Sequence, residues 1–192
     1  SYGKYKGRLL STQSRFGLLR QRQLRAVADP STRLSIAQSF ASGKLLNQRT
    51  ILQRYLREKD CPALEAAVAG IQDCVDKLDI AKDIDSVMGL EGRASALYYA
   101  AFKGVLKQDF GFEARVRRPA TDPVNSLLSF GYSLLARGME AGVYTVGLDP
   151  FLGFLHSTRY SRPSLVLDLI EEFRPVIVDS VVLRAINTHA IT

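Results

Sequence analysis

The sequence predicts an all-α fold, a multi-helix domain preceded by one short strand. Apolar residues recur at helical spacing through most of the 192 residues. Two Asp-Pro pairs, Asp29-Pro30 and Asp122-Pro123, join an N-cap residue to a proline in the first helical turn, which is typical of helix starts. Residues 2–10 have the alternating side-chain pattern of a strand and include aromatic residues and glycines. One strand cannot form a sheet, so helices are expected to build the core.

The periodicity and the capping signals predict helices over residues 12–28, 30–57, 63–78, 89–107, 123–141, 163–175 and 176–187. Glu91 then lies in the first turn of the fourth helix, and residues 110–120 form a basic loop before the fifth. Pro175 is expected to kink or split the sixth helix, because a proline has no backbone N–H to donate.

The composition is that of an ordinary globular protein, but the charged residues are unevenly distributed along the chain. The hydrophobic content is 46%, and no apolar run approaches the ~20 residues that cross a bilayer. Cys61 and Cys74 are the only cysteines, which indicates free thiols and a cytoplasmic protein. Residues 1–57 hold twelve Lys or Arg against Asp29 alone, whereas the remaining residues are net acidic within a total of +7. This segregation favours a polyanionic partner over a merely solvated helix face.

The side chains best suited to chemistry lie in residues 147–175. This stretch holds His156, one of two histidines, followed by Asp168, Glu171 and Glu172. The acids are three and four positions apart, so they crowd one side of a helix and repel one another unless solvated or bound to a cation. Imidazole and carboxylates without cysteine suit Mn²⁺ or Mg²⁺ better than structural zinc.

The same stretch resembles two linked motifs of the CRISPR-associated integrase of spacer acquisition, the endonuclease of CRISPR adaptation. In that family GLDPxxGFLH is followed by a helix reading roughly LDLxExFRP. The matching residues are Gly147, Leu148, Asp149, Pro150, Gly153, Phe154, Leu155, His156, Leu167, Asp168, Leu169, Glu171, Phe173, Arg174 and Pro175. Residues 89–102 and 122–135 resemble two further family segments, the first of which carries a glutamate ligand at the position of Glu91.

The resemblance implies a site in which Glu91, His156 and Glu171 bind one Mn²⁺ or Mg²⁺ ion and are catalytic. Asp168 is a further candidate, either as a ligand or through a water molecule. Contacts to the DNA backbone are expected from the basic segment and the basic loop, through Arg15, Arg20, Arg22, Arg25, Arg115, Arg117 and Arg118.

The implied function is insertion of spacer DNA into a CRISPR array by transesterification, on double-stranded and branched DNA. In the family the full-length protein forms a homodimer and works with a small ferredoxin-like adaptation protein, away from any membrane. Residues 1–10 are then a remnant strand and linker of an N-terminal β domain, and residues 11–192 a catalytic domain truncated at its C-terminus. Two alternatives are a transposon-encoded integrase of the same family and a non-catalytic basic helical scaffold that binds DNA.

Overall fold

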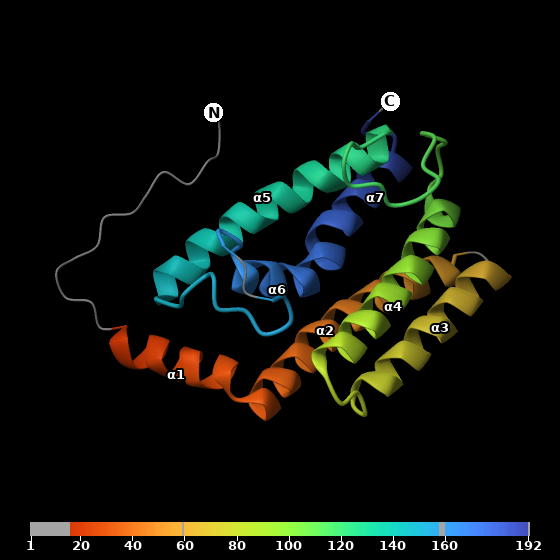
Figure 1. Ribbon diagram of the computed structural model, residues 1–192. Coiled ribbons are helices and arrows are strands. Elements are labelled where there is room, and N and C mark those ends of the chain that lie inside the picture. The colour runs from red at the N-terminus through yellow and green to blue at the C-terminus, as the bar shows by residue number, and fades with distance from the viewer. Residues whose placement is uncertain (1–15, 59, 158–159, 192) are drawn as a thin grey trace.

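A computed structural model describes residues 16–58, 60–157 and 160–191, and the regular elements in these ranges are all helices (Figure 1). The prediction of an all-α fold is confirmed for this part of the chain, whereas the predicted strand at residues 2–10 lies outside it. The elements are α1 (Gly17–Ala28), α2 (Pro30–Leu56), α3 (Pro62–Leu78), α4 (Ile84–Val105), α5 (Pro123–Val146), α6 (Ser164–Phe173), the π-helix η1 (Arg174–Asp179) and α7 (Ser180–Asn187).

Side-chain caps explain where three of these helices begin. Asp29 accepts a hydrogen bond from the Thr32 amide at 2.8 Å, and Asp122 accepts one from the Asn125 amide at 2.8 Å, as the Asp-Pro pairs predict. Asp83 caps α4 in the same way through the Ser86 amide at 2.7 Å. The cap at Asp83 starts α4 five residues before the predicted position. The expectation that Glu91 lies in the first turn was therefore wrong, because it lies in the third.

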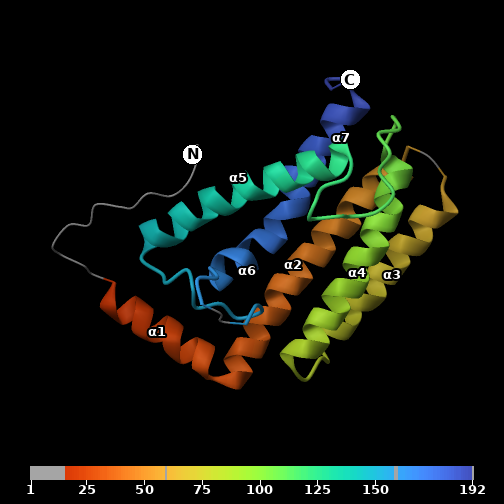
Figure 2. The ribbon, with the colours of Figure 1, turned by 45° about the horizontal axis from the view of Figure 1, so that its top comes forward.

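Helix α2 occupies the centre of the molecule (Figures 1 and 2). It packs against α3 and α4 on one side and against α6 on the other, with α5 covering α6. The larger apolar core fills the space between α2, α3 and α4, with Leu45, Leu52, Ile71 and Phe102 fully buried. Each such side chain contributes about 1.5–3 kcal/mol through removal from water. Residues of α2 can therefore contact both α4 and α6.

The chain after α6 follows a wider helical path. Pro175 was expected to kink or split the helix, and residues 174–179 indeed form a π-helix before α7 begins at Ser180. Proline cannot donate the i→i−4 hydrogen bond, and π-type turns accommodate such an interruption. The wider turn places Asp179 in the interior with no exposed surface.

In the described part of the chain, the helices are too short or too polar for any of them to cross a membrane.

Candidate metal centre

Asp168 holds the loop that carries His156. Its carboxylate is fully buried and accepts hydrogen bonds from the backbone amides of Phe154 at 2.6 Å, Leu155 at 3.0 Å and His156 at 2.9 Å. His156 Nδ1 lies 2.7 Å from Asp168 Oδ1. A proton on Nδ1 that is donated to Asp168 leaves the lone pair of Nε2 free for a metal ion. Each oxygen of Asp168 already meets two partners, so Asp168 can orient a ligand in this geometry but has no lone-pair direction left to be one.

Gly153 makes this arrangement sterically possible. A Cβ atom at position 153 would lie 2.7 Å from the Ser164 backbone carbon and 2.8 Å from Asp168 Oδ2. Such distances are shorter than real Cβ contacts, and the backbone of α6 cannot move aside. A glycine is therefore required where the loop folds over the start of α6.

Side chains of helices α1 and α2 form hydrogen bonds to the same loop from outside. The amide of Gln23 donates to the carbonyl oxygens of Asp149 and Leu152, and Gln23 Oε1 accepts from the Asp149 amide at 2.8 Å. Arg33 Nε donates to the Phe154 carbonyl at 2.9 Å. Gln23 thus satisfies three backbone groups of the loop.

Glu91 and Glu171 converge on one cation, the ammonium of Lys44. Lys44 Nζ lies 2.6 Å from Glu171 Oε2 and also pairs with Glu91 Oε1, which accepts a further hydrogen bond from Ser95 Oγ at 3.0 Å. Arg174 Nη1 binds the other oxygen of Glu171 at 2.6 Å. Lys44 and Glu171 are both about 95% buried, being 4% and 5% exposed. Three helices that are distant in sequence thus bring two acids to one point.

The electrostatics of Glu171 suit a cation-binding carboxylate. Burial alone would raise its pKa, but the ammonium of Lys44 and the guanidinium of Arg174 outweigh burial and hold the pKa below its usual value. His156 also lies close enough to act on Glu171 in the same direction. Glu171 therefore remains a carboxylate although it is almost completely buried.

Glu91, His156 and Glu171 fit a divalent cation by their chemistry. Within residues 16–58, 60–157 and 160–191, no group of three or more His, Cys, Asp or Glu side chains is already arranged to hold a metal ion. The ammonium of Lys44 instead lies between the carboxylates of Glu91 and Glu171. Glu171 Oε2 is buried and takes no regular hydrogen bond from the described residues, so its partner is a cation. Oxygen donors that already converge on a positive charge are what Mn²⁺ or Mg²⁺ requires.

A third buried carboxylate, Asp179, lies near the site. Its oxygens accept hydrogen bonds from the hydroxyls of Tyr98, at 2.9 Å, and Tyr132. Arg115 and Arg174 lie over the Tyr132 ring, 5.4 Å and 4.9 Å from its centre. Burial raises the pKa of Asp179 to about 6, against the opposing effect of the two tyrosine hydroxyls.

Asp179→Asn is expected to flatten the pH dependence of stability. The folded protein binds the Asp179 proton more tightly than the unfolded chain, whose carboxyl has a pKa of 3.8. The stabilisation from this proton is complete below pH 4 and is lost as the pH rises to about 6, a difference of about 2–3 kcal/mol. Urea unfolding between pH 4.5 and 7.5 measures it. Asp79→Asn, at an exposed position, is the control, and parallel profiles for wild type and Asp179→Asn would contradict the assignment.

Comparison with known proteins identifies the family. The family model described as CRISPR associated protein Cas1 matches residues 1–192. The chain belongs to the Cas1 family. The resemblance inferred from residues 147–175 is thereby confirmed.

Two curated Cas1 relatives show the extent of the similarity. The chain is 40% identical over 190 residues to a CRISPR-associated endonuclease Cas1 of Thermus thermophilus, covering 99% of this chain and 55% of the relative. It is also 40% identical to a CRISPR-associated endonuclease Cas1 of Leptospira interrogans, covering 91% of this chain and 71% of that protein. This Cas1 chain spans about half the length of most of the curated relatives it matches.

Solved structures share the fold. A Cas1 protein from Thermotoga maritima superposes with a TM-score of 0.80 at 32% identity, covering 92% of this chain and 54% of the other. A casposase bound to integration product superposes with a TM-score of 0.81 at 29% identity, covering 99% and 53%. The helical arrangement of this Cas1 chain is thus one that a DNA-bound relative also adopts.

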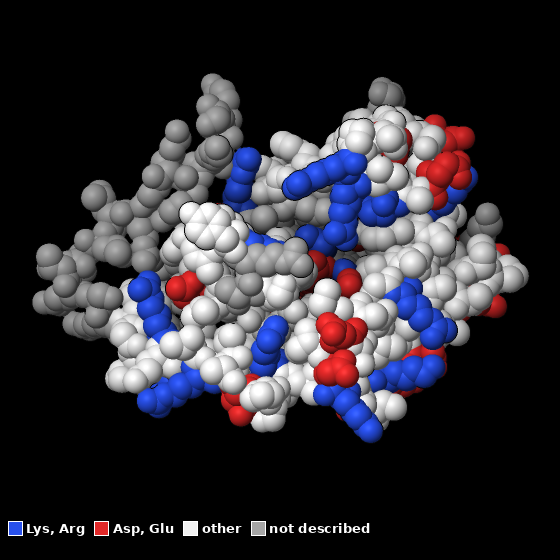
Figure 3. Space-filling model, in the orientation of Figure 1, with Lys and Arg blue, Asp and Glu red and all other residues white. Residues whose placement is uncertain are grey.

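The arginines predicted to bind DNA differ in their surroundings. Arg22, Arg25, Arg117 and Arg118 are exposed, whereas Arg15 lies outside the described residues. Two of the predicted arginines are half-buried and engaged in this Cas1 domain: Arg20 Nε donates to the Gly147 carbonyl at 3.0 Å, and Arg115 donates to Asn125 and Ser129. Figure 3 shows basic side chains spread over one face, some over α1 and others near the start of α5.

Sequence reasoning missed Lys44, Ser95 and Arg33 as parts of the candidate site. Lys44 was counted only among the basic residues of the N-terminal segment. One signal was present, because a lysine among apolar residues of a predicted buried helix needs an acidic partner. The identity of that partner depends on the packing of α2 against α4 and α6.

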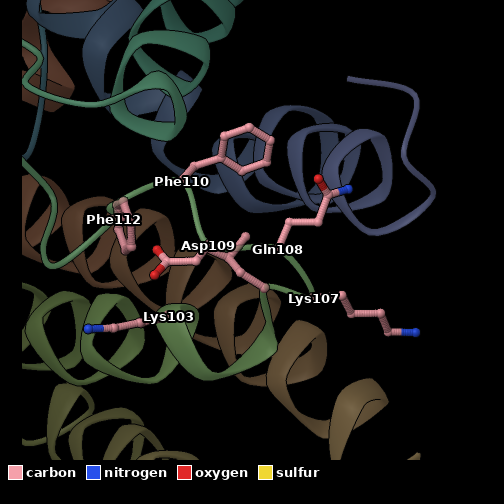
Figure 4. Close-up of a pocket in the computed structure, with 7 residues that line it drawn as sticks. Lys103, Lys107, Gln108, Asp109, Phe110 and Phe112 are labelled. Atoms are coloured by element: carbon pink, nitrogen blue, oxygen red, sulfur yellow. The ribbon is translucent and has the colours of Figure 1, made fainter. Parts of the chain in front are cut away.

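A pocket at the end of α4 lies apart from this site. Its lining includes Lys103, Lys107, Gln108 and Asp109, none of which belongs to the candidate metal centre. Figure 4 shows the two lysine side chains pointing away from each other. The polar groups do not converge, so this pocket offers no arrangement for chemistry.

Proposed function

We propose that this chain is the helical catalytic part of a metal-dependent DNA endonuclease and integrase that inserts spacer DNA into a CRISPR array by transesterification. The observation that carries the proposal is the convergence of Glu91 and Glu171 on one cation position in a chain of the Cas1 family, with His156 near enough to act electrostatically on Glu171. The names of its relatives, CRISPR-associated endonucleases, support the same activity.

The proposed ligands are Glu91, Glu171 and Nε2 of His156, with Mn²⁺ or Mg²⁺ as the ion. When bound, the ion would neutralise charge on the phosphodiester and lower the pKa of an attacking hydroxyl. Asp168 orients the imidazole, Ser95 fixes Glu91, and Arg174 fixes Glu171. With a DNA 3′-hydroxyl as attacker the reaction is strand transfer, and with water it is hydrolysis.

The proposed partners are double-stranded and branched DNA, held through the phosphate backbone by Arg22, Arg25, Arg117 and Arg118. Solved relatives include a casposase bound to integration product and a Cas6-RT-Cas1–Cas2 complex, which supports DNA and a Cas2-type companion. Dimerisation of the full-length protein and a ferredoxin-like fold of the companion belong to the same proposal. A transposon-encoded integrase is less well supported, because the curated relatives at 40% identity are named CRISPR-associated endonucleases.

Glu91→Ala tests the proposal against a non-catalytic scaffold. In the full-length protein, Mn²⁺ affinity and strand-transfer rate are both expected to fall about 100-fold or more, because one of three ligands is lost. Titration calorimetry and transfer of a 3′-hydroxyl oligonucleotide into target DNA measure the two quantities. The control is Glu65→Ala, at an exposed position in α3. A scaffold would bind Mn²⁺ equally well, or not at all, with and without Glu91.

A further inference from the structure

Lys44 differs from the other lysines whose ion pairs the structure describes. Lys77 and Lys103 pair with acids at the surface, where their side chains are 47% and 51% exposed. The Lys44 side chain is 5% exposed and reaches from α2 to acids on two other helices, Glu91 on α4 and Glu171 on α6. Its ammonium is a compact charge with three donors, comparable to a small cation in what it offers to carboxylates.

We propose that Lys44 is an internal counter-ion that holds the metal site together without metal and is exchanged for the divalent cation. The inference rests on the proposed function, because it takes Glu91 and Glu171 as ligands. The same oxygen atoms, Glu91 Oε1 and Glu171 Oε2, face the ammonium now and would face the metal ion. Glu91 Oε1 already meets the Lys44 ammonium and the Ser95 hydroxyl, so both of its lone pairs are engaged until the ammonium leaves.

The charges of the buried cluster favour exchange over simultaneous binding. Glu91, Glu171 and Asp168, which holds His156, supply three negative charges, and Lys44 and Arg174 supply two positive ones. The ligands and the groups that touch them therefore carry one net negative charge. A divalent ion added beside Lys44 would leave an excess of one positive charge in a site with little water. A divalent ion in place of Lys44 leaves the cluster neutral.

The close contact between α2 and α6 keeps Lys44 in reach of the site. A Cβ atom at Gly43 would lie 2.8 Å from the Glu172 carboxyl carbon, and Asn47 Nδ2 donates to the Glu172 carbonyl at 2.9 Å. These contacts tie α2 to α6 on both sides of Lys44. Lys44 is thus a positioning residue, which orders the two acids before the metal ion arrives.

A purely structural role of Lys44 and a role in cation exchange predict opposite changes in metal affinity when Lys44 is lost. If Lys44 only locked α2 to α4 and α6, its loss would disorder the acids and weaken metal binding. If it competes with the ion, its loss removes a positive charge from the ligand atoms and strengthens binding. The sign of the change in Mn²⁺ affinity therefore separates the two roles.

The test compares Lys44→Gln and Lys44→Arg in the full-length protein, with Lys103→Gln as the surface control. Lys44→Gln is expected to bind Mn²⁺ about 10-fold or more tightly, and to melt at a lower temperature without metal but recover with it. Lys44→Arg keeps the charge and should stay within about threefold of wild type. Titration calorimetry and thermal melting with and without Mn²⁺ supply the readouts. Equal or weaker Mn²⁺ binding by Lys44→Gln overturns the proposal.

A wild-type measurement covers the case in which Lys44→Gln does not fold. The ¹⁵N resonance of the Lys44 ammonium, recognised by its absence from Lys44→Arg, should shift when Mg²⁺ is added. A resonance that stays unchanged while Mg²⁺ binds overturns the exchange but leaves the metal site intact. If wild type binds neither Mn²⁺ nor Mg²⁺, the proposed function fails, and the role of Lys44 fails with it.

Discussion

His156→Ala is expected to reduce metal-dependent strand transfer by about 10³-fold or more while the protein remains folded. The imidazole is the one nitrogen ligand of the proposed site, and Asp168 orients it through Nδ1. Its loss should cost little stability, because the backbone amide of residue 156 still donates to Asp168. Transfer of a 3′-hydroxyl oligonucleotide into a branched or duplex target in Mn²⁺ measures the rate.

The other histidine provides a matched control for this variant. His189 is exposed near the end of α7, where its Nδ1 lies 2.8 Å from Gln108 Nε2. His189→Ala should keep the wild-type rate, and both variants should bind DNA as wild type does, because neither residue is among the proposed phosphate contacts. Strand transfer that survives in a folded His156→Ala protein would remove His156 from the active site.

Asp168→Ala is expected to produce a large loss of stability, about 3–5 kcal/mol. The substitution leaves the buried amides of Phe154 and Leu155, and both donors of His156, without their charged acceptor. The loop over α6 would lose its attachment, and activity would fall together with stability. Urea unfolding should show a lower midpoint at an unchanged slope, and the melting temperature should fall on the order of 10 °C.

Two further variants separate the carboxylate of Asp168 from its position on α6. Glu172→Ala, on the same helix outside the cation cluster, should change stability by no more than about 0.5–1 kcal/mol. Asp168→Asn keeps the shape but turns an amide donor toward backbone donors, so it should lie between wild type and Asp168→Ala. Equal stability of Asp168→Ala and Glu172→Ala would show that the loop is held by other contacts.

Local signals in the sequence were sufficient for most of the helices. Asp29 and Asp122 cap their helices through amides three residues ahead, and this interaction involves only neighbouring residues. The start of α4 was predicted too late because the cap at Asp83 follows an acid-rich stretch in which several aspartates could serve. The placement of Glu91 in the first turn failed for that reason.

The sequence by itself determined the helical class, the helix starts at the two Asp-Pro pairs and, through the motifs at residues 89–102 and 147–175, the family and its candidate ligands. Only the tertiary structure decided that Asp168 binds the His156 loop on all its lone pairs and that Lys44 lies between Glu91 and Glu171. The reason is physical: a cap or a turn depends on residues three or four apart, whereas the buried charge of Lys44 requires a partner supplied by another helix. That partner is chosen by how α2, α4 and α6 pack, which no local pattern encodes.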